Sequence, residues 1–219
     1  MTKLGMSPQR PVYRAYQQDP DRVREWKETI YPQIHAEAAA VGAKVFFADE
    51  AAIRTDHHGG RTWARVGKTP VVAATGARHS VNMISAVSPR GELYFEVFQG
   101  CMNAAGFIGF CQRLLADVGT PVFVVVDGSP VHTAKAVQKY VESTDGRLRL
   151  YVFPPYSPQL SPGKWVWRSV KHRIKRSVAM SKIHLYTLAH DALTWLKEKP
   201  NLVRGLFYDV CLDYIPKAA

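Results

Sequence analysis

Acidic residues are scarce in this 219-residue chain, which has 18 Asp and Glu against 29 Lys and Arg. The formal net charge of +11 at pH 7 favours a polyanionic partner, and nucleic acid is the commonest one. Composition alone also leaves open a basic but otherwise ordinary soluble enzyme. The hydrophobic fraction of 47% and the charged fraction of 21% are typical of a globular protein and exclude a disordered chain.

Cysteines and long apolar runs are also few. The three cysteines are widely spaced and form no Cys-x-x-Cys pair, which argues against a zinc site or a disulfide framework and indicates a reducing compartment. No apolar run approaches the roughly 18 residues that a membrane span needs. The opening residues, MTKLGMSPQR, lack the apolar core of a signal peptide. We therefore expect a cytoplasmic protein with no membrane partner.

The order of the apolar segments predicts a mixed α/β sheet. Residues 43–50, 121–128 and 148–153 predict buried strands, and residues 79–100 predict a hairpin around Pro89-Arg90-Gly91. Helical spacing predicts helices over residues 103–118 and 133–143, from residue 162 onward, and over residues 185–197. The strands come first as a meander and then alternate with helices, which is typical of a sheet flanked by helices.

Two of the predicted strands end in an aspartate, Asp49 and Asp127. If these strands are neighbours in one sheet, both carboxylates converge at an edge and can share a divalent ion. Mg²⁺ prefers hard oxygen ligands, so convergent carboxylates indicate a phosphoryl-transfer site. The alternative is that each aspartate is a simple strand-end cap or turn residue.

Four segments together resemble the catalytic domain of mariner-like insertion-sequence transposases of bacteria. They are FFADEAAIRTDHHGGRTWARVGKTP, HSVNMISAVSPRGELYFEVFQG, FVVVDGSPVHTAKAV and FPPYSPQLSPGKWVWRSVKHRIK, and they follow the family's order. The resemblance implies an RNase H-like fold, a mixed five-stranded sheet flanked by helices, in which two Asp and a third acid bind Mg²⁺ (or Mn²⁺). It implies that Asp49 and Asp127 are catalytic residues and metal ligands. His132 matches a histidine that commonly follows the second Asp, unless it is a helix-start histidine without a catalytic part.

The third acid is where this sequence departs from the family. The family's Asn-Pro-x-Glu reads Ser161-Pro162-Gly163-Lys164 here, so Lys164 occupies the position of the glutamate. Ser161 and Pro162 still favour a helix start, with the serine as cap and the proline in the first helical position. A protonated lysine cannot ligate Mg²⁺. At an effective dielectric near 20, a positive charge about 4 Å from the ion repels it by up to about 4 kcal/mol for each unit of charge on the ion. The sequence therefore predicts impaired cleavage of DNA.

Other acids are poorly placed to replace the missing glutamate. Glu50 follows Asp49 directly, and strand alternation directs it to the opposite face. Glu142, Asp145 and Asp191 lie outside the matching segment. A catalytically inactive DNA-binding or regulatory transposase remnant is therefore the alternative function, and an unrelated enzyme with a fortuitous Asp pair is the third.

The helix from residue 162 is predicted to contact DNA phosphates. Lys164, Arg168, Lys171 and Lys175 form one cationic face by spacing, and no acid interrupts residues 164–190. Trp167, Val170, Ile174 and Val178 form the opposite, apolar face. The predicted DNA-binding residues are Arg168, Lys171, Lys175 and Arg176, with Arg61 and Arg65 from the loop after Asp49. Trp63 and Trp165 are predicted to pack in a core or interface rather than to stack on bases.

The opening residues resemble only the tail of the N-terminal DNA-binding region of this family. We therefore expect residues 1–42 to be a linker or remnant of that region, residues 43–200 the catalytic domain and residues 201–219 a C-terminal tail. The implied partner is DNA, as transposon ends and target. The same interpretation allows a homodimer, a separate helix-turn-helix polypeptide and an association with the bacterial nucleoid.

Overall fold

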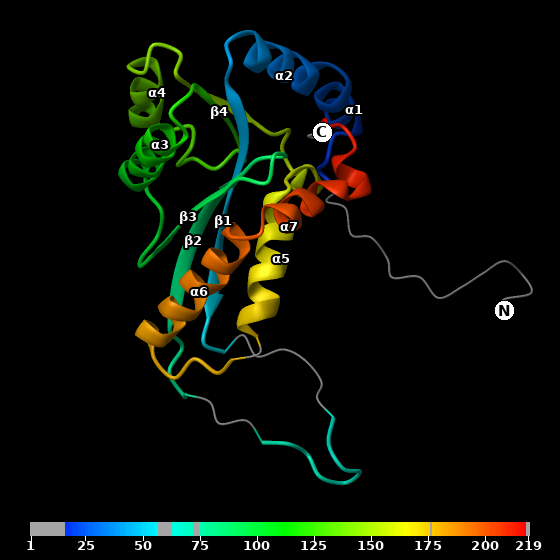
Figure 1. Ribbon diagram of the computed structural model, residues 1–219, viewed down its shortest axis with the longest axis vertical. Coiled ribbons are helices and arrows are strands. Elements are labelled where there is room, and N and C mark those ends of the chain that lie inside the picture. Colours follow the sequence, from blue (N-terminus) through cyan, green and yellow to red (C-terminus); the bar gives the residue numbers. More distant parts are fainter. Residues whose placement is uncertain (1–15, 57–62, 72–74, 176, 218–219) are drawn as a thin grey trace, which may run out of the picture.

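A five-stranded mixed sheet forms the centre of the computed structural model, which describes residues 16–56, 63–71, 75–175 and 177–217 (Figure 1). The strand order is β3-β2-β1-β4-β5. The β1–β2 and β2–β3 pairs are antiparallel, and the β1–β4 and β4–β5 pairs are parallel. The strands are β1 (Lys44–Arg54), β2 (Ser80–Val87), β3 (Leu93–Phe98), β4 (Val122–Val126) and β5 (Leu148–Val152).

Helices cover both faces of this sheet (Figure 1). One face carries α3 (Ala104–Val118) and α4 (Lys135–Glu142), and the other carries α5 (Gly163–Ile174) and α6 (Lys182–Lys197). This arrangement is the predicted mixed sheet flanked by helices. The remaining elements are α1 (Pro20–Glu25), the π-helical turn η2 (Trp26–Ile30), α2 (Tyr31–Ala40), α7 (Pro200–Gly205) and the 3-10 turns η3 (Pro158–Leu160), η4 (Leu206–Tyr208) and η5 (Val210–Leu212).

The two central strands supply side chains to both layers. In β1, Phe46 and Ala48 pack against the α3–α4 layer, whereas Phe47 packs in the layer that contains α5 and α6. All five residues of β4 are buried, as expected of a central parallel strand covered by helices on both faces. The register of the parallel pair places Phe47 beside Val125, and two residues further on each strand path reaches an aspartate.

Local sequence signals set the ends of the predicted helix and hairpin. The Asn103 side chain accepts a hydrogen bond from the Gly106 N–H at the start of α3, and Gly119 ends the helix with φ of 71°. Gly91 closes the β2–β3 turn with φ of 90°, where an added Cβ would lie 2.5 Å from the Pro200 carbonyl oxygen. Glycine is required there because both the backbone angle and the close approach exclude a side chain.

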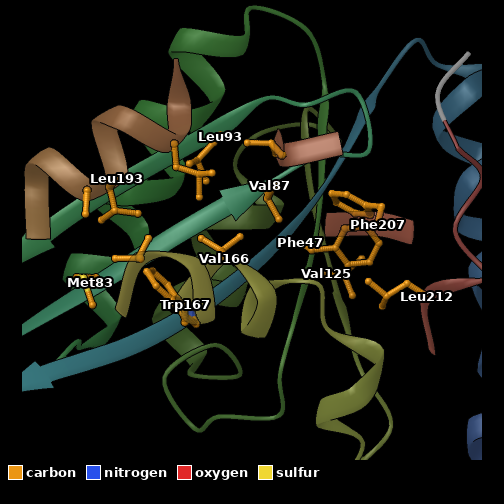
Figure 2. Close-up of a cluster of buried hydrophobic side chains, with 14 of the residues drawn as sticks. Phe47, Met83, Val87, Leu93, Val125, Val166, Trp167, Leu193, Phe207 and Leu212 are labelled. Carbon is orange, nitrogen blue, oxygen red and sulfur yellow. The ribbon is translucent and has the colours of Figure 1, made fainter. Parts of the chain in front are cut away.

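Both ends of the described chain pack into the core on the α5 side. Phe207 and Leu212 from the C-terminal part are buried in one cluster with Phe47 (Figure 2). Trp26 and Tyr31 from the N-terminal part belong to the same cluster. Side chains from the expected lead-in and tail therefore lie in the same buried cluster as β1. Among the described residues, no helix combines the length and apolar character needed to cross a bilayer.

Phe47 is the side chain that joins these segments. Its ring centroid lies 5.7 Å from that of Tyr31, 6.1 Å from that of Phe153 and 5.9 Å from that of Phe207. We predict that Phe47→Ala lowers the free energy of unfolding by about 3–5 kcal/mol, because it leaves a cavity between three segments. Urea denaturation followed by circular dichroism measures the change. The control Val210→Ala removes an 84% exposed side chain and should change it by less than about 0.5 kcal/mol. Equal effects of the two substitutions would contradict the central position of Phe47.

Candidate active site

Asp49 and Asp127 come together because β1 and β4 are parallel neighbours. Phe47 of β1 pairs with Val125 of β4, and each aspartate lies two residues further along its chain segment. This register brings both aspartates toward the same end of the sheet. Both line one cavity of about 520 Å³, which Lys164 also lines. The structure thus brings together the two predicted metal ligands and the residue in the third-acid position.

The first turn of α5 lies in close contact with Asp49. A Cβ added to Gly163 would lie 2.3 Å from the Asp49 Cβ and 2.6 Å from its Oδ2. Asp49 Oδ1 accepts a hydrogen bond from the Glu50 N–H at 2.9 Å. Burial raises the pKa of Asp49 to about 6, and the nearby charge of Asp127 adds to this effect, while the Glu50 N–H opposes it. Asp49 therefore ionises less readily than an ordinary aspartate.

Asp127 is held in a different environment, with its side chain 67% exposed. Its Oδ1 lies 2.9 Å from His132 Nδ1 and accepts a hydrogen bond from the Ser129 N–H at 3.1 Å. The hydrogen bond with His132 lowers the pKa of Asp127. The two carboxylates of the cavity therefore have pKa values shifted in opposite directions.

His132 connects this cavity with the other layer of the fold. Its side chain is only 3% exposed, packs with its ring centroid 4.5 Å from that of Phe107, and has Nε2 3.2 Å from Glu50 Oε1. Burial by itself lowers the pKa of His132, but the hydrogen bonds to Asp127 and Glu50 raise it to about 9. Only the imidazolium donates from both ring nitrogens, so at neutral pH His132 is a cation between two carboxylates.

Glu50 lies on the face opposite to Asp49, as strand alternation predicts. Its partner is His132, which packs against α3, whereas Asp49 packs against Gly163 of α5. Glu142, Asp145 and Asp191 line no part of the cavity. None of the alternative acids therefore takes the third position beside Asp49 in the described residues.

Lys164 lines the same cavity as Asp49 and Asp127 without pairing with either of them. It is half-buried, and its Nζ lies 5.1 Å from the centroid of the Trp165 ring. In the ranges that the structure describes, it forms no ion pair with Asp49 or Asp127, and no group of three His, Cys, Asp or Glu side chains is arranged to hold a metal. Two carboxylates beside a cation fit one weakly held divalent ion and do not fit a pair of ions.

The start of α5 differs slightly from its prediction. Ser161 Oγ accepts a hydrogen bond from the Gly163 N–H at 3.1 Å, but the helix begins at Gly163, one residue later than the serine–proline pattern predicts. Sequence reasoning missed the role of Gly163. A glycine in the first turn of a helix lowers the stability of that helix. Its presence at this position is therefore a sequence signal that another group approaches the backbone closely.

The cationic face of α5 is present. Arg168 and Lys175 are exposed and Lys171 is half-buried, while Val166, Trp167, Val170 and Ile174 are buried on the opposite side. Val178 lies beyond the end of the helix, so it does not extend the apolar face as predicted.

Of the remaining predicted DNA contacts, the structure describes only Arg65. Arg65 is exposed in the segment 63–71, which Figure 1 draws extending away from the sheet, and it does not line the cavity. Arg61 and Arg176 lie outside the described residues. Trp63 is fully exposed, so it does not pack in the core, whereas Trp165 is partly buried against the core cluster.

Gly163→Ala tests the close contact between α5 and Asp49. The added methyl group has to displace either the helix or the Asp49 side chain, and we expect the free energy of unfolding to fall by about 1–3 kcal/mol. Chemical denaturation in EDTA measures it. Gly205→Ala is the matched control, since no atom lies within 4 Å of its added Cβ. If both substitutions have the same effect, α5 does not approach Asp49 as described.

Asp49→Asn tests the raised pKa of Asp49. The pKa of Asp49 is raised from 3.8 to about 6. The contribution of Asp49 to the free energy of unfolding is therefore complete below pH 3.8 and is lost as the pH rises through 6. Asn is never charged, so the variant should be more stable than the parent by about 1–2 kcal/mol at pH 7.5, after allowance for the exposed part of the carboxyl. The difference should vanish near pH 4.

Denaturation by urea at the two pH values, in EDTA, gives this comparison. Asp127→Asn should behave oppositely and lose stability at pH 7.5, because the pKa of Asp127 is lowered. An Asp49→Asn variant that is no more stable than the parent at pH 7.5 would refute burial of an ionised Asp49.

Comparison with known proteins agrees with this geometry. A family model described as DDE superfamily endonuclease matches residues 44–185, and one described as winged helix-turn helix matches residues 1–30. The search of curated proteins finds no match.

Several solved structures share the fold. The mariner Mos1 paired-end complex with Mg has a TM-score of 0.66 at 14% identity, over 100% of this chain and 69% of that chain. The Mos1 paired-end complex with the left transposon end has a TM-score of 0.63 at 14% identity, over 93% and 67% of the two chains. The catalytic domain of Mos1 mariner transposase has a TM-score of 0.59 at 13% identity, over 91% and 96%.

The predicted RNase H-like fold, with its mixed five-stranded sheet and flanking helices, is confirmed by these matches. The endonuclease family model covers more than half of the chain. The protein therefore belongs to the DDE superfamily endonucleases.

Proposed function

We propose that this protein is the catalytic domain of a DDE-type transposase whose cleavage activity is weakened by Lys164. The reaction is metal-dependent hydrolysis of a DNA phosphodiester at a transposon end, followed by strand transfer by the freed 3′-hydroxyl. The observation that carries the proposal is the shared cavity of Asp49 and Asp127 on a DDE fold. The solved relatives named as paired-end complexes support DNA as the substrate.

Asp49 and Asp127 would hold the divalent ion, Mg²⁺ or Mn²⁺. Relatives named as complexes with Mn and with Mg support this choice, as does the hard oxygen chemistry of the two carboxylates. The chemistry that such an ion supplies when bound is neutralisation of the phosphate charge and activation of the attacking oxygen. The missing third carboxylate leaves its affinity low.

The protein's own side chains prepare the cavity in three ways. The charged His132 keeps Asp127 ionised and holds the Asp127 Oδ1 at 2.9 Å from its own Nδ1. Gly163 lets the first turn of α5 cover Asp49 and exclude water from it. Lys164 contributes a positive charge that attracts a phosphate but repels a second ion. The cavity thus suits binding of DNA better than cleavage of it.

A non-catalytic DNA-binding or regulatory role is the second candidate. It is favoured by one observation, the cation Lys164 in the cavity where a third acid is expected. In this role Arg168, Lys171 and Lys175, with Arg176, Arg61 and Arg65, would bind DNA phosphates without a metal. Binding would then weaken steeply with salt and be insensitive to EDTA.

Assembly and location also belong to the proposal. The match of residues 1–30 to a winged helix-turn-helix model supports a DNA-binding region in this part of the chain. A homodimer, or a separate polypeptide that carries the helix-turn-helix modules, would supply recognition of transposon ends. Both would act on DNA in the bacterial cytoplasm, associated with the nucleoid.

Lys164→Glu tests the third-acid position. The substitution removes a cation and adds a carboxylate, so Mn²⁺ affinity, measured by calorimetry, should rise by at least about tenfold, which corresponds to about 1.4 kcal/mol. Mg²⁺-dependent nicking of supercoiled DNA should rise with it. Lys164→Gln is the matched control, since it removes the charge without adding a ligand and should give a smaller gain.

Two outcomes would contradict the proposal in different ways. Robust Mg²⁺-dependent nicking by the unmodified chain would show that Lys164 does not impair it. Unchanged metal affinity in Lys164→Glu would show that this residue does not occupy the third-acid position.

A further inference from the structure

A second cavity lies next to the candidate active site, on the outer side of α5. We call this cavity the indole groove; its volume is about 580 Å³, and residues of α5, α6 and η4 line it. The lining residues are Trp165, Arg168, Ser169, His172, Arg173, Trp195 and Leu206. No acidic residue is among them. Its volume falls in the range of about 300–1,000 Å³ that is typical of ligand pockets.

Cations lie over both indole rings of the groove. Arg168 Cζ is 5.3 Å from the ring centroid of Trp165, and Arg173 Cζ is 4.4 Å from that of Trp195. Lys199 Nζ is 5.4 Å from the Trp195 centroid. Within the described part of the chain, none of these three cations forms an ion pair with an acid. The groove therefore combines uncompensated positive charge with aromatic surfaces.

A second hollow continues this pattern beyond Trp165. It holds about 270 Å³ and is lined by Trp165, Gly205, Leu206, Tyr208 and Asp209. Tyr208 is 62% exposed, and Lys217 Nζ lies 4.7 Å from its ring centroid. Asp209 is the one acid that lines it, and its Oδ1 accepts a hydrogen bond from the Cys211 N–H. Three aromatic side chains with cations beside them thus follow one another over this surface.

Recessed rings favour one form of nucleic acid over another. In a duplex the faces of the bases are covered by stacking, and only the base edges and the phosphates reach protein side chains. An unpaired base exposes both faces and can stack on an indole or on a guanidinium plane. Trp165 and Trp195 are only partly exposed within the groove, whereas Arg168 and Arg173, which lie over their rings, are exposed. This arrangement suits a base that stacks on the edge of an indole ring or on the outer face of its guanidinium, with its phosphate on a neighbouring cation.

We propose that the indole groove binds unpaired nucleotides of a DNA strand that passes the candidate active site. Trp165 links the two sites, because Lys164, which lines the active-site cavity, and Arg168, which lines the groove, both lie over its ring. The proposal deepens the proposed function, since it gives the strand beside the cleavage site a place to bind. It replaces the expectation that Trp165 serves in packing alone.

Binding without metal separates this inference from the catalytic proposal. The experiment measures fluorescence anisotropy of a labelled single-stranded dT oligonucleotide and of a duplex of the same length, both in EDTA. We expect Trp165→Ala to weaken single-strand binding by about tenfold or more, as for loss of one stacked base. Duplex binding should change by less than about twofold, and Trp165→Phe should restore most of the single-strand affinity.

Surface variants keep the test valid if Trp165→Ala does not fold. The double variant Arg168→Gln/Arg173→Gln changes only exposed side chains of the groove and should weaken single-strand binding more than duplex binding. Arg90→Gln is the control, because it removes one exposed positive charge from the β2–β3 turn. Quenching of tryptophan emission by the oligonucleotide, reduced in Trp165→Phe, gives an independent readout of stacking.

Each outcome decides the proposal. Equal losses of single-strand and duplex affinity in the groove variants would overturn it and leave only a phosphate-binding surface. A chain that binds duplex but not single strands would also overturn it, while the catalytic proposal would stand. Single-strand binding through Trp165 without any Mg²⁺-dependent nicking would support the groove and count against catalysis.

Discussion

The parallel pairing of β1 and β4 is the constraint on which the rest of the site depends. Its register fixes Phe47 beside Val125, and therefore brings Asp49 and Asp127 to one cavity. The same register keeps the Glu50 carboxylate out of the cavity. Because side chains alternate along a strand, a carboxylate at Glu50 has to face the other layer, where it serves His132 instead of the cavity.

The first turn of α5 then decides what this cavity can do. Gly163 permits the backbone to touch Asp49, and the next residue, Lys164, brings a cation to the same cavity. Counting formal charges at neutral pH, Lys164 and His132 carry two positive charges against the carboxylates of Asp49, Asp127 and Glu50. Because these two cations offset part of the negative charge, our proposal expects a weaker attraction for a divalent ion than in a site with three acids.

The sequence predicted the parts of this structure that depend on local pattern. Alternation and apolar runs predicted the five strands, and helical spacing predicted the helix over residues 103–118, because these patterns act within a few residues. Contacts between distant segments could not be predicted in this way. The approach of Gly163 to Asp49 and the bridge from His132 to Glu50 depend on how whole layers pack, and no spacing along the chain encodes that distance.

Trp165 shows why binding and cleavage need not be lost together. Its ring lies beneath both Lys164 and Arg168, so Lys164, which by our proposal takes the place of a metal ligand, also extends the positive surface from the cavity toward the indole groove. A carboxylate in place of Lys164 would improve the site for an ion and would at the same time remove one cation from that surface. Under the proposed function, metal affinity and DNA affinity should therefore respond in opposite directions to a substitution of Lys164.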